Sequence, residues 1–214
     1  MIIQIPDKLE PEKIAAFSNQ LNGLEEMDEY VFDFGKTRWF SPFSMLLLSR
    51  VLNQFKAERQ NSRRRALNFE NHSYAAHLGF FRSFGLRHGN EPGEAIGNDR
   101  YVPLQTLTRA ELDAESVDMV AELGDLIEAK SSRLAAILTQ GHDEVLHETL
   151  TYSIREIFRN VFEHSNCEEV SFCAQYWLTK KLVEVGIVDA GIGVRTGLAK
   201  NPKFRNFTNL EALQ

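Results

Sequence analysis

The 214-residue sequence predicts an α/β fold, and two observations support this prediction. In the first hundred residues, short apolar runs alternate with longer segments whose apolar residues recur every three or four positions. In the second half, an amphipathic helical pattern is followed by two strand-like runs that a short turn connects. Alternating strands and helices are typical of helices layered on a sheet.

The helices of the first hundred residues are indicated by residues that favour helix ends. Pro42 suits the first turn of one helix, and Gly23 and Gly85 suit the ends of two others. We expect a mainly parallel sheet, since the strands alternate with helices. The expected elements are strands over residues 2–5, 30–34 and 65–69, helices over residues 11–21, 42–55 and 74–84, and a loop over residues 88–100.

The second half of the sequence continues the alternation. Leu178-Thr179-Lys180 separates two runs of alternating polarity, which predicts an antiparallel hairpin. The expected elements are strands over residues 101–107, 169–176 and 181–188, and helices over residues 110–127, 131–148 and 150–164.

The last expected helix carries a group of polar residues. Glu156 and Asn160 are four residues apart, so they share one face, and Glu163 and His164 follow one turn later on the same side. Such a group suits a hydrated magnesium ion, which binds few protein ligands and several waters. Asn160 could supply an oxygen ligand, and Glu156 could polarise a water or hydroxyl nucleophile.

The last expected strand ends in the turn Asp189-Ala190-Gly191-Ile192-Gly193. A carboxylate at a strand end can accept a hydrogen bond from an amino group such as that of adenine. Gly191 and Gly193 remove side chains where a ligand would lie against the backbone.

Together the two patterns resemble the N-box and first glycine box of the GHKL ATPases. The matching residues are Glu156-x-x-x-Asn160-x-x-Glu163-His164, followed by Asp189-x-Gly191-x-Gly193. That superfamily includes gyrase B, MutL, sensor histidine kinases and anti-sigma-factor kinases, and the last two are the most similar branch. The resemblance covers about residues 101–214.

The resemblance implies a Bergerat-type α/β sandwich that binds ATP and Mg²⁺. It implies Asn160 on magnesium, Glu156 as the general base and Asp189 on the adenine amino group. It also implies further nucleotide contacts, at Glu163, His164, Gly191 and Gly193.

A second glycine box, which holds the phosphates in that superfamily, has no match after Gly193. Residues 194–214, which include Lys200-Asn201-Pro202-Lys203, have the composition expected at the start of a lid. We therefore expect either that the domain is incomplete at its C-terminal side in this sequence or that another element completes the pocket.

The first 86 residues resemble a STAS domain, the fold of anti-sigma-factor antagonists. The similar segments are Val31-Phe32-Asp33-Phe34-Gly35 and Phe40-Ser41-Pro42-Phe43-Ser44-Met45-Leu46-Leu47. The family's phosphoacceptor position falls at Phe43, and Ser41 is expected to cap the following helix. The predicted domains are therefore a STAS-like interaction domain over residues 1–100 and a GHKL ATP-binding domain over residues 101–214.

Composition argues against some partners and locations. With 24 basic and 30 acidic residues the net charge is −6, which disfavours binding to nucleic acid or to an anionic membrane. The two cysteines, Cys167 and Cys173, have no zinc-site spacing and are expected to be free thiols in a reducing compartment. The start of the sequence lacks a basic leader, and no apolar run approaches a membrane span of about 18 residues. We expect a cytoplasmic protein.

The leading hypothesis is an ATP-binding regulatory protein with a protein partner, which hydrolyses ATP or transfers its γ-phosphate to a partner serine. An alternative is a non-catalytic nucleotide sensor or scaffold, which the lack of a second glycine box favours. A DNA-processing ATPase is disfavoured by the acidic composition. Because GHKL modules often form dimers, a homodimer is one expected state.

Overall fold

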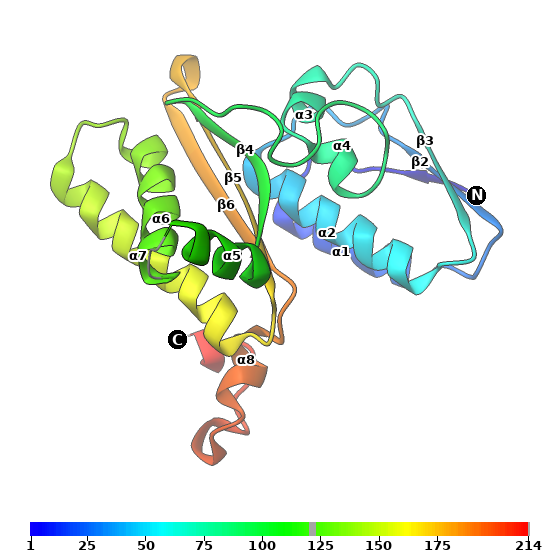
Figure 1. Ribbon diagram of the computed structural model, residues 1–214. Helices are drawn as coiled ribbons and strands as arrows, with labels where there is room; N and C mark the ends of the chain where they lie inside the picture. Colours follow the sequence, from blue (N-terminus) through cyan, green and yellow to red (C-terminus); the bar gives the residue numbers. More distant parts are fainter. Residues whose placement is uncertain (120–122, 214) are drawn as a thin grey trace. The chain divides into compact units, whose positions relative to one another are not determined.

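The computed structural model describes residues 1–119 and 123–213 and confirms the α/β fold class (Figure 1). The chain divides into two compact units. The first unit comprises Met1–Gln105 and Phe172–Ile187, and the second comprises Thr106–Ser171 and Val188–Gln214. The predicted domains, residues 1–100 and 101–214, are a different division and stay a prediction.

A three-stranded parallel sheet lies in the first unit, as the sequence predicts. The strand order is β1-β2-β3, and Phe32 in the central strand pairs with Ile3 on one side and with Ala66 on the other. Its strands and the helices that connect them are β1 (Ile2–Gln4), α1 (Pro11–Asn22), β2 (Glu29–Asp33), α2 (Pro42–Glu58) and β3 (Arg63–Leu67). All five lie within a few residues of their predicted bounds.

Aromatic side chains form much of the core of the first unit. Tyr30 and Phe32 are two residues apart on β2, so their side chains lie on the same face of the sheet. Their rings lie 4.9 Å and 5.5 Å from the Phe55 ring of α2 in edge-on contacts. Phe34, at the end of the same strand, is fully buried against Phe81. The apolar period of two in β2 therefore determines which face of the sheet the helices cover.

A carboxylate from β6 (Leu182–Asp189) lies at the N-terminus of α2, within the first unit. Glu184 Oε1 accepts hydrogen bonds from the Ser41 hydroxyl (2.7 Å) and from the Phe43 backbone N–H (2.9 Å). Ser41 occupies the N-cap position, as predicted. Gly186 lies so near this turn that an added Cβ would be 2.8 Å from Phe43 Cα.

The prediction of one helix over residues 74–84 is wrong. Two short helices, α3 (Ser73–His77) and α4 (Phe80–Ser83), are separated at Gly79, whose φ of +89° lies in the left-handed region. An added Cβ at Gly79 would lie 3.1 Å from backbone atoms of Glu91 and Pro92. The helix breaks here because the left-handed backbone and the close approach of Glu91 and Pro92 both favour glycine.

The second sheet has the order β4-β5-β6 and includes the predicted hairpin. Its other two strands are β4 (Tyr101–Thr108) and β5 (Glu169–Trp177), and the short 3-10 helix η1 (Leu178–Lys180) connects β5 to β6. Near the two ends of β4, Tyr176 N–H donates to Arg100 O and Arg109 N–H donates to Glu168 O, so β4 and β5 run antiparallel. A connection as short as residues 178–181 requires β5 and β6 to be antiparallel as well.

The helices of the second unit differ from the predicted ones in their bounds. They are α5 (Arg109–Met119), α6 (Leu123–Thr139) and α7 (Glu144–His164). The prediction of a helix over residues 131–148 is wrong because Gln140 and Gly141 adopt positive φ and end α6, and Asp143 then caps α7 by accepting from Leu146 N–H. The predicted helix over residues 110–127 crosses residues 120–122, which lie outside the described residues.

Candidate functional site

Helix α7 carries the polar residues that the sequence singles out. Ile154, Phe158 and Val161 form its buried face, and α6 packs along it. The neighbouring face carries Ile157, 45% exposed, and Asn160, which is also exposed. This face leaves apolar and amide groups open to a ligand because the buried residues of α7 occupy the adjacent stripe.

The turn after β6 is fixed against the C-terminal end of α7. Asp189 Oδ1 accepts a hydrogen bond from Gly191 N–H (2.6 Å), and Ile192 N–H donates to Ser165 O (2.8 Å). An added Cβ at Gly191 would lie 2.4 Å from Ser165 Cβ. Gly191 therefore has no side chain because the protein itself occupies that space.

Gly193 serves a different purpose in the same turn. Its φ is +75°, and no atom lies within 4 Å of the position that a Cβ would take. Gly193 begins the short helix α8 (Gly193–Leu198) and borders open space. Its backbone conformation, not crowding, favours glycine here.

These elements surround a pocket of about 600 Å³ in the second unit. Of the predicted site residues, Asn160 and His164 line it from α7, and Asp189 and Gly193 line it from the turn. The remaining lining residues are Ile157, Val161, Ser165, Val194, Gly197, Leu198 and Lys200. Two sequence patterns that are far apart in the chain thus lie around one cavity.

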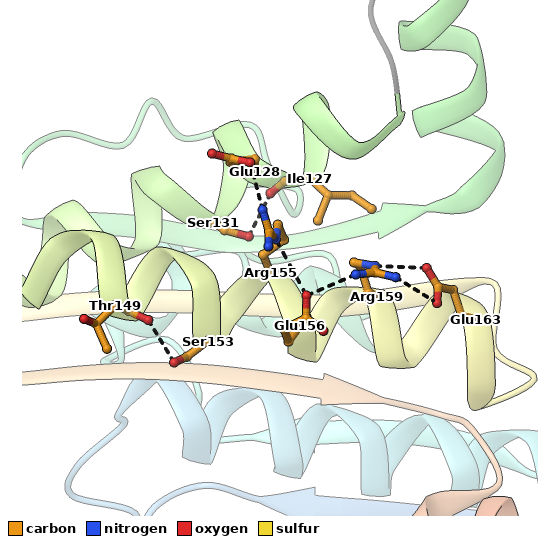
Figure 2. Close-up of polar contacts among 9 residues, drawn as sticks. All are labelled: Ile127, Glu128, Ser131, Thr149, Ser153, Arg155, Glu156, Arg159 and Glu163. Carbon is orange, nitrogen blue, oxygen red and sulfur yellow. Dashed lines mark hydrogen bonds and ion pairs between the residues drawn. The ribbon is translucent and has the colours of Figure 1, made fainter.

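Glu156 and Glu163 of α7 belong to a series of ion pairs (Figure 2). Arg159 bridges Glu156 and Glu163, with nitrogen–oxygen distances of 3.1 Å and 3.0 Å. Arg155 contacts Glu156 at 3.7 Å and Glu128 of α6 at 3.1 Å. The series connects α6 to three successive turns of α7.

These contacts shift the pKa values of Arg159 and Glu163, the pair at the end of the series. The hydrogen bond from Arg159 holds the pKa of the Glu163 carboxyl below its usual range. The same carboxylate, with Glu156, raises the pKa of the Arg159 guanidinium. Glu163 therefore forms an ion pair with Arg159 on the helix surface.

Three of the predicted site residues are not among the residues that line the pocket. Glu156 and Glu163 carry the ion pairs, and Gly191 lies against Ser165. Glu156 and Glu163 are seven residues apart and so share a stripe of α7, which is rotated from the stripe of Asn160 and His164. The predicted role of Glu156 as a general base stays a prediction.

The pocket combines apolar walls with a few polar groups at its margin. Ile157, Val161, Val194 and Leu198 supply hydrocarbon surface, and Asp189 supplies an acceptor beside it. The Asp189 carboxylate keeps further lone pairs beyond its bond to Gly191. Such a lining suits a flat ring with a hydrogen-bond donor at its edge.

A magnesium site is the second feature that the resemblance implies for this pocket. Among residues 1–119 and 123–213, no group of three or more His, Cys, Asp or Glu side chains is placed to hold a metal ion. Magnesium often binds one or two protein oxygens together with waters and substrate phosphates. The Asn160 carboxamide at the pocket wall fits that mode, in which most ligands come from a nucleotide and water.

Sequence reasoning missed several residues of the pocket. Ile157 and Val161 had a signal, because they are four residues apart and lie on either side of Asn160, but only the polar residues of the helix were singled out. Lys200 was noted only as part of a lid-like segment, and its ammonium lies 3.4 Å from Asn166 Oδ1. Val194 and Leu198 had no signal, since the position of α8 depends on the turn at Asp189.

Comparisons with protein-family models, curated proteins and solved structures found no match for this chain. No helix in the described part of the chain combines the length and apolar character needed to cross a bilayer. The functional interpretation therefore depends on the residues of the pocket and on the motifs that supply them.

Proposed function

We propose that this protein is an ATP-binding regulatory protein of the histidine-kinase-like ATPase type, and that ATP·Mg²⁺ binds in the pocket of the second unit. The observation that supports this most is that Asn160, Asp189 and Gly193 line one cavity. They come from the two motifs that resemble the N-box and the first glycine box. Chance would not bring both motifs to one apolar pocket of this size as readily as selection for a nucleotide would.

Each residue has a role that its chemistry supports. The adenine ring would lie against Ile157 and Val161, with its amino group donating to the Asp189 carboxylate. Asn160 would hold the magnesium ion, which supplies charge neutralisation on the phosphates. Lys200, which also lines the pocket, would add a positive charge for the phosphates.

Isothermal titration of the full chain with ATP and ADP, with and without Mg²⁺, tests this proposal. We expect Asn160→Ala to abolish the Mg²⁺-dependent part of binding and Asp189→Asn to weaken ATP and ADP alike, by about tenfold or more. Asn22→Ala and Asp125→Asn are matched controls, because both side chains are exposed and lie outside the pocket. Unchanged affinity in both site variants would contradict the proposal.

A second candidate function, a non-catalytic nucleotide sensor, is favoured by the position of Glu156. Its carboxylate lies between Arg155 and Arg159 rather than in the pocket lining. A general base must reach the nucleophile within hydrogen-bond distance, directly or through one water. A γ-phosphate release assay separates the two functions: an enzyme loses turnover but keeps ATP affinity in Glu156→Gln, whereas a sensor shows no turnover in either form.

The regulatory part of the proposal concerns the first unit. Its α/β layer would be the STAS-like interaction module, acting on a partner protein in the cytoplasm. Either the partner would receive the γ-phosphate or its binding would depend on the nucleotide. A homodimer of the second unit is compatible with both functions.

A further inference from the structure

A second cavity, of about 650 Å³, lies along the outer edge of β3 in the first unit. We propose that it is a docking groove for an extended acidic segment of a partner protein, which adds to the sheet as a fourth strand beside β3. This inference does not depend on nucleotide binding. The groove is lined by Glu29, Phe32, Leu52, Lys56, Ser62, Arg63, Arg64, Arg65, Ala66, Phe84, Gly85 and Leu86.

The backbone of β3 offers free hydrogen-bonding groups on that side. β3 is an edge strand, and Arg63 N–H and Leu67 O bond toward the β2 side. Since successive residues of a strand direct their backbone groups to opposite sides, the N–H and C=O of Arg64 and Ala66 face outward. A strand added there would complete the ladder.

The side chains on both flanks of this edge are basic. Arg64 and Ala66 pair with Tyr30 and Phe32 and so lie on the face of α2, which leaves Arg63 and Arg65 on the opposite face. Lys56 of α2 lies on the first of these faces, with its ammonium beside Gly85. An added strand would therefore meet cations on either face, and one whose acidic side chains alternate with apolar ones could place the acidic ones beside Arg63 and Arg65 and the apolar ones beside Phe32 and Leu52.

These cations form no salt bridge in the described chain, and the residue paired with Arg63 on β2 is Glu29. No salt bridge engages Lys56, Arg63 or Arg65 among residues 1–119 and 123–213, and Glu29 is the one carboxylate in the lining. Charged residues on an edge strand also discourage unwanted pairing. That protective role requires only the charges. It does not require the cavity beside the strand, whose apolar floor includes Phe32 and Leu52.

A partner protein fits this groove better than nucleic acid does. The free N–H and C=O groups along β3 match the main chain of a peptide, and phosphates cannot satisfy both donors and acceptors. The net charge of −6 also opposes a long polyanion. The occupant is therefore an acidic segment short enough to interact mainly with the local cations.

Fluorescence anisotropy of a labelled peptide in which glutamate alternates with valine tests the proposal on the full chain. Two further peptides, with lysine in place of glutamate and with proline in place of valine, test charge and backbone pairing. We expect the Glu–Val peptide to bind about tenfold more tightly than either of the other two peptides. We expect the double variant Arg63→Glu with Arg65→Glu to weaken binding of the Glu–Val peptide by about tenfold or more. The matched control, Arg50→Glu with Arg133→Glu, makes the same charge change at exposed residues outside the groove.

Hydrogen exchange of the unmodified chain gives an answer even if the double variant does not fold. We expect the Glu–Val peptide to slow exchange at the Arg64 and Ala66 amides. Equal binding of the Glu–Pro peptide, equal loss in the control variant, displacement by a single-stranded oligonucleotide at equal concentration, or no binding at all would overturn the proposal.

Discussion

At the scale of single residues, glycine is favoured at two positions of the turn after β6 for different physical reasons. Gly191 lies where a side chain would overlap Ser165, and Gly193 has a left-handed backbone beside open space. The first glycine keeps the turn against α7, and the second directs the chain into α8. Both belong to the turn from which Asp189 lines the pocket.

Substitution of Gly191 tests the crowding at this turn. We expect Gly191→Ala to lower the free energy of unfolding by about 1–3 kcal/mol, because Ser165 and its backbone must move. Gly197→Ala is the matched control, since its Cβ would meet no atom within 4 Å and alanine favours the helix that contains it. Urea denaturation of both variants measures the difference, and equal stability would show that Ser165 moves away at no cost.

The carboxyl of Glu163 gives a test of pH dependence. Its pKa lies below the usual range because Arg159 donates to it, so the stabilisation is present above the ordinary pKa and is lost as the pH falls through the lowered value. We expect Arg159→Gln to raise the pKa of Glu163. An NMR titration of its side-chain carboxyl carbon measures this pKa. Arg133→Gln should leave the midpoint in place, and an unshifted midpoint in Arg159→Gln would contradict the assigned cause.

At the scale of elements, the N-terminus of α2 depends on a residue far along the chain. Glu184 accepts from Ser41 and Phe43, so β6 of the hairpin supplies the negative charge that a helix N-terminus favours. Within the first unit, the segment Phe172–Ile187 is thereby connected to the N-terminal α/β layer.

Removal of the Glu184 carboxylate should weaken that connection. We expect Glu184→Ala to cost about 1–2 kcal/mol of unfolding free energy, the usual range for the loss of a helix cap. The comparison is Glu169→Ala at the exposed start of β5, which should have little effect. Similar losses in the two variants would mean that the bonds to Ser41 and Phe43 contribute nothing measurable.

Local signals predicted most elements, and tertiary contacts account for what they missed. The short apolar run at residues 30–34 and the proline at residue 42 placed β2 and α2 correctly. The break at Gly79 was missed because its cause is the backbone at Glu91 and Pro92, which no local pattern reveals. Gly141 did carry a local signal for the end of α6, which the predicted helix over residues 131–148 did not take into account.

The candidate site could be predicted in part for the same reason. Helical spacing and the end of a strand are local properties, so Asn160 and Asp189 could be singled out. The orientation of Glu156 could not, because it depends on Arg155, Arg159 and the position of Glu128 on another helix. The groove beside β3 had only the run of three arginines as its signal.

At the scale of the whole molecule, the two cysteines report on the state of the fold. Cys173 is fully buried in β5, and burial raises the pKa of its thiol, whereas Cys167 is partly exposed. We expect iodoacetamide to modify Cys167 and to leave Cys173 intact until the protein unfolds, as mass spectrometry of the peptides would show. Rapid native labelling of Cys173 would mean that the sheet opens far more readily than its buried core implies.

The central claim is that one pocket of the second unit holds an adenine nucleotide. Photo-cross-linking with 8-azido-ATP, followed by peptide mapping, tests this most directly. The account predicts label within residues 157–165, at the C-terminal end of α7, and within residues 189–200, which include the turn and α8. This label should be removed by excess ADP and reduced in Asp189→Asn. Labelling confined to other segments, or labelling that ADP does not displace, would contradict it.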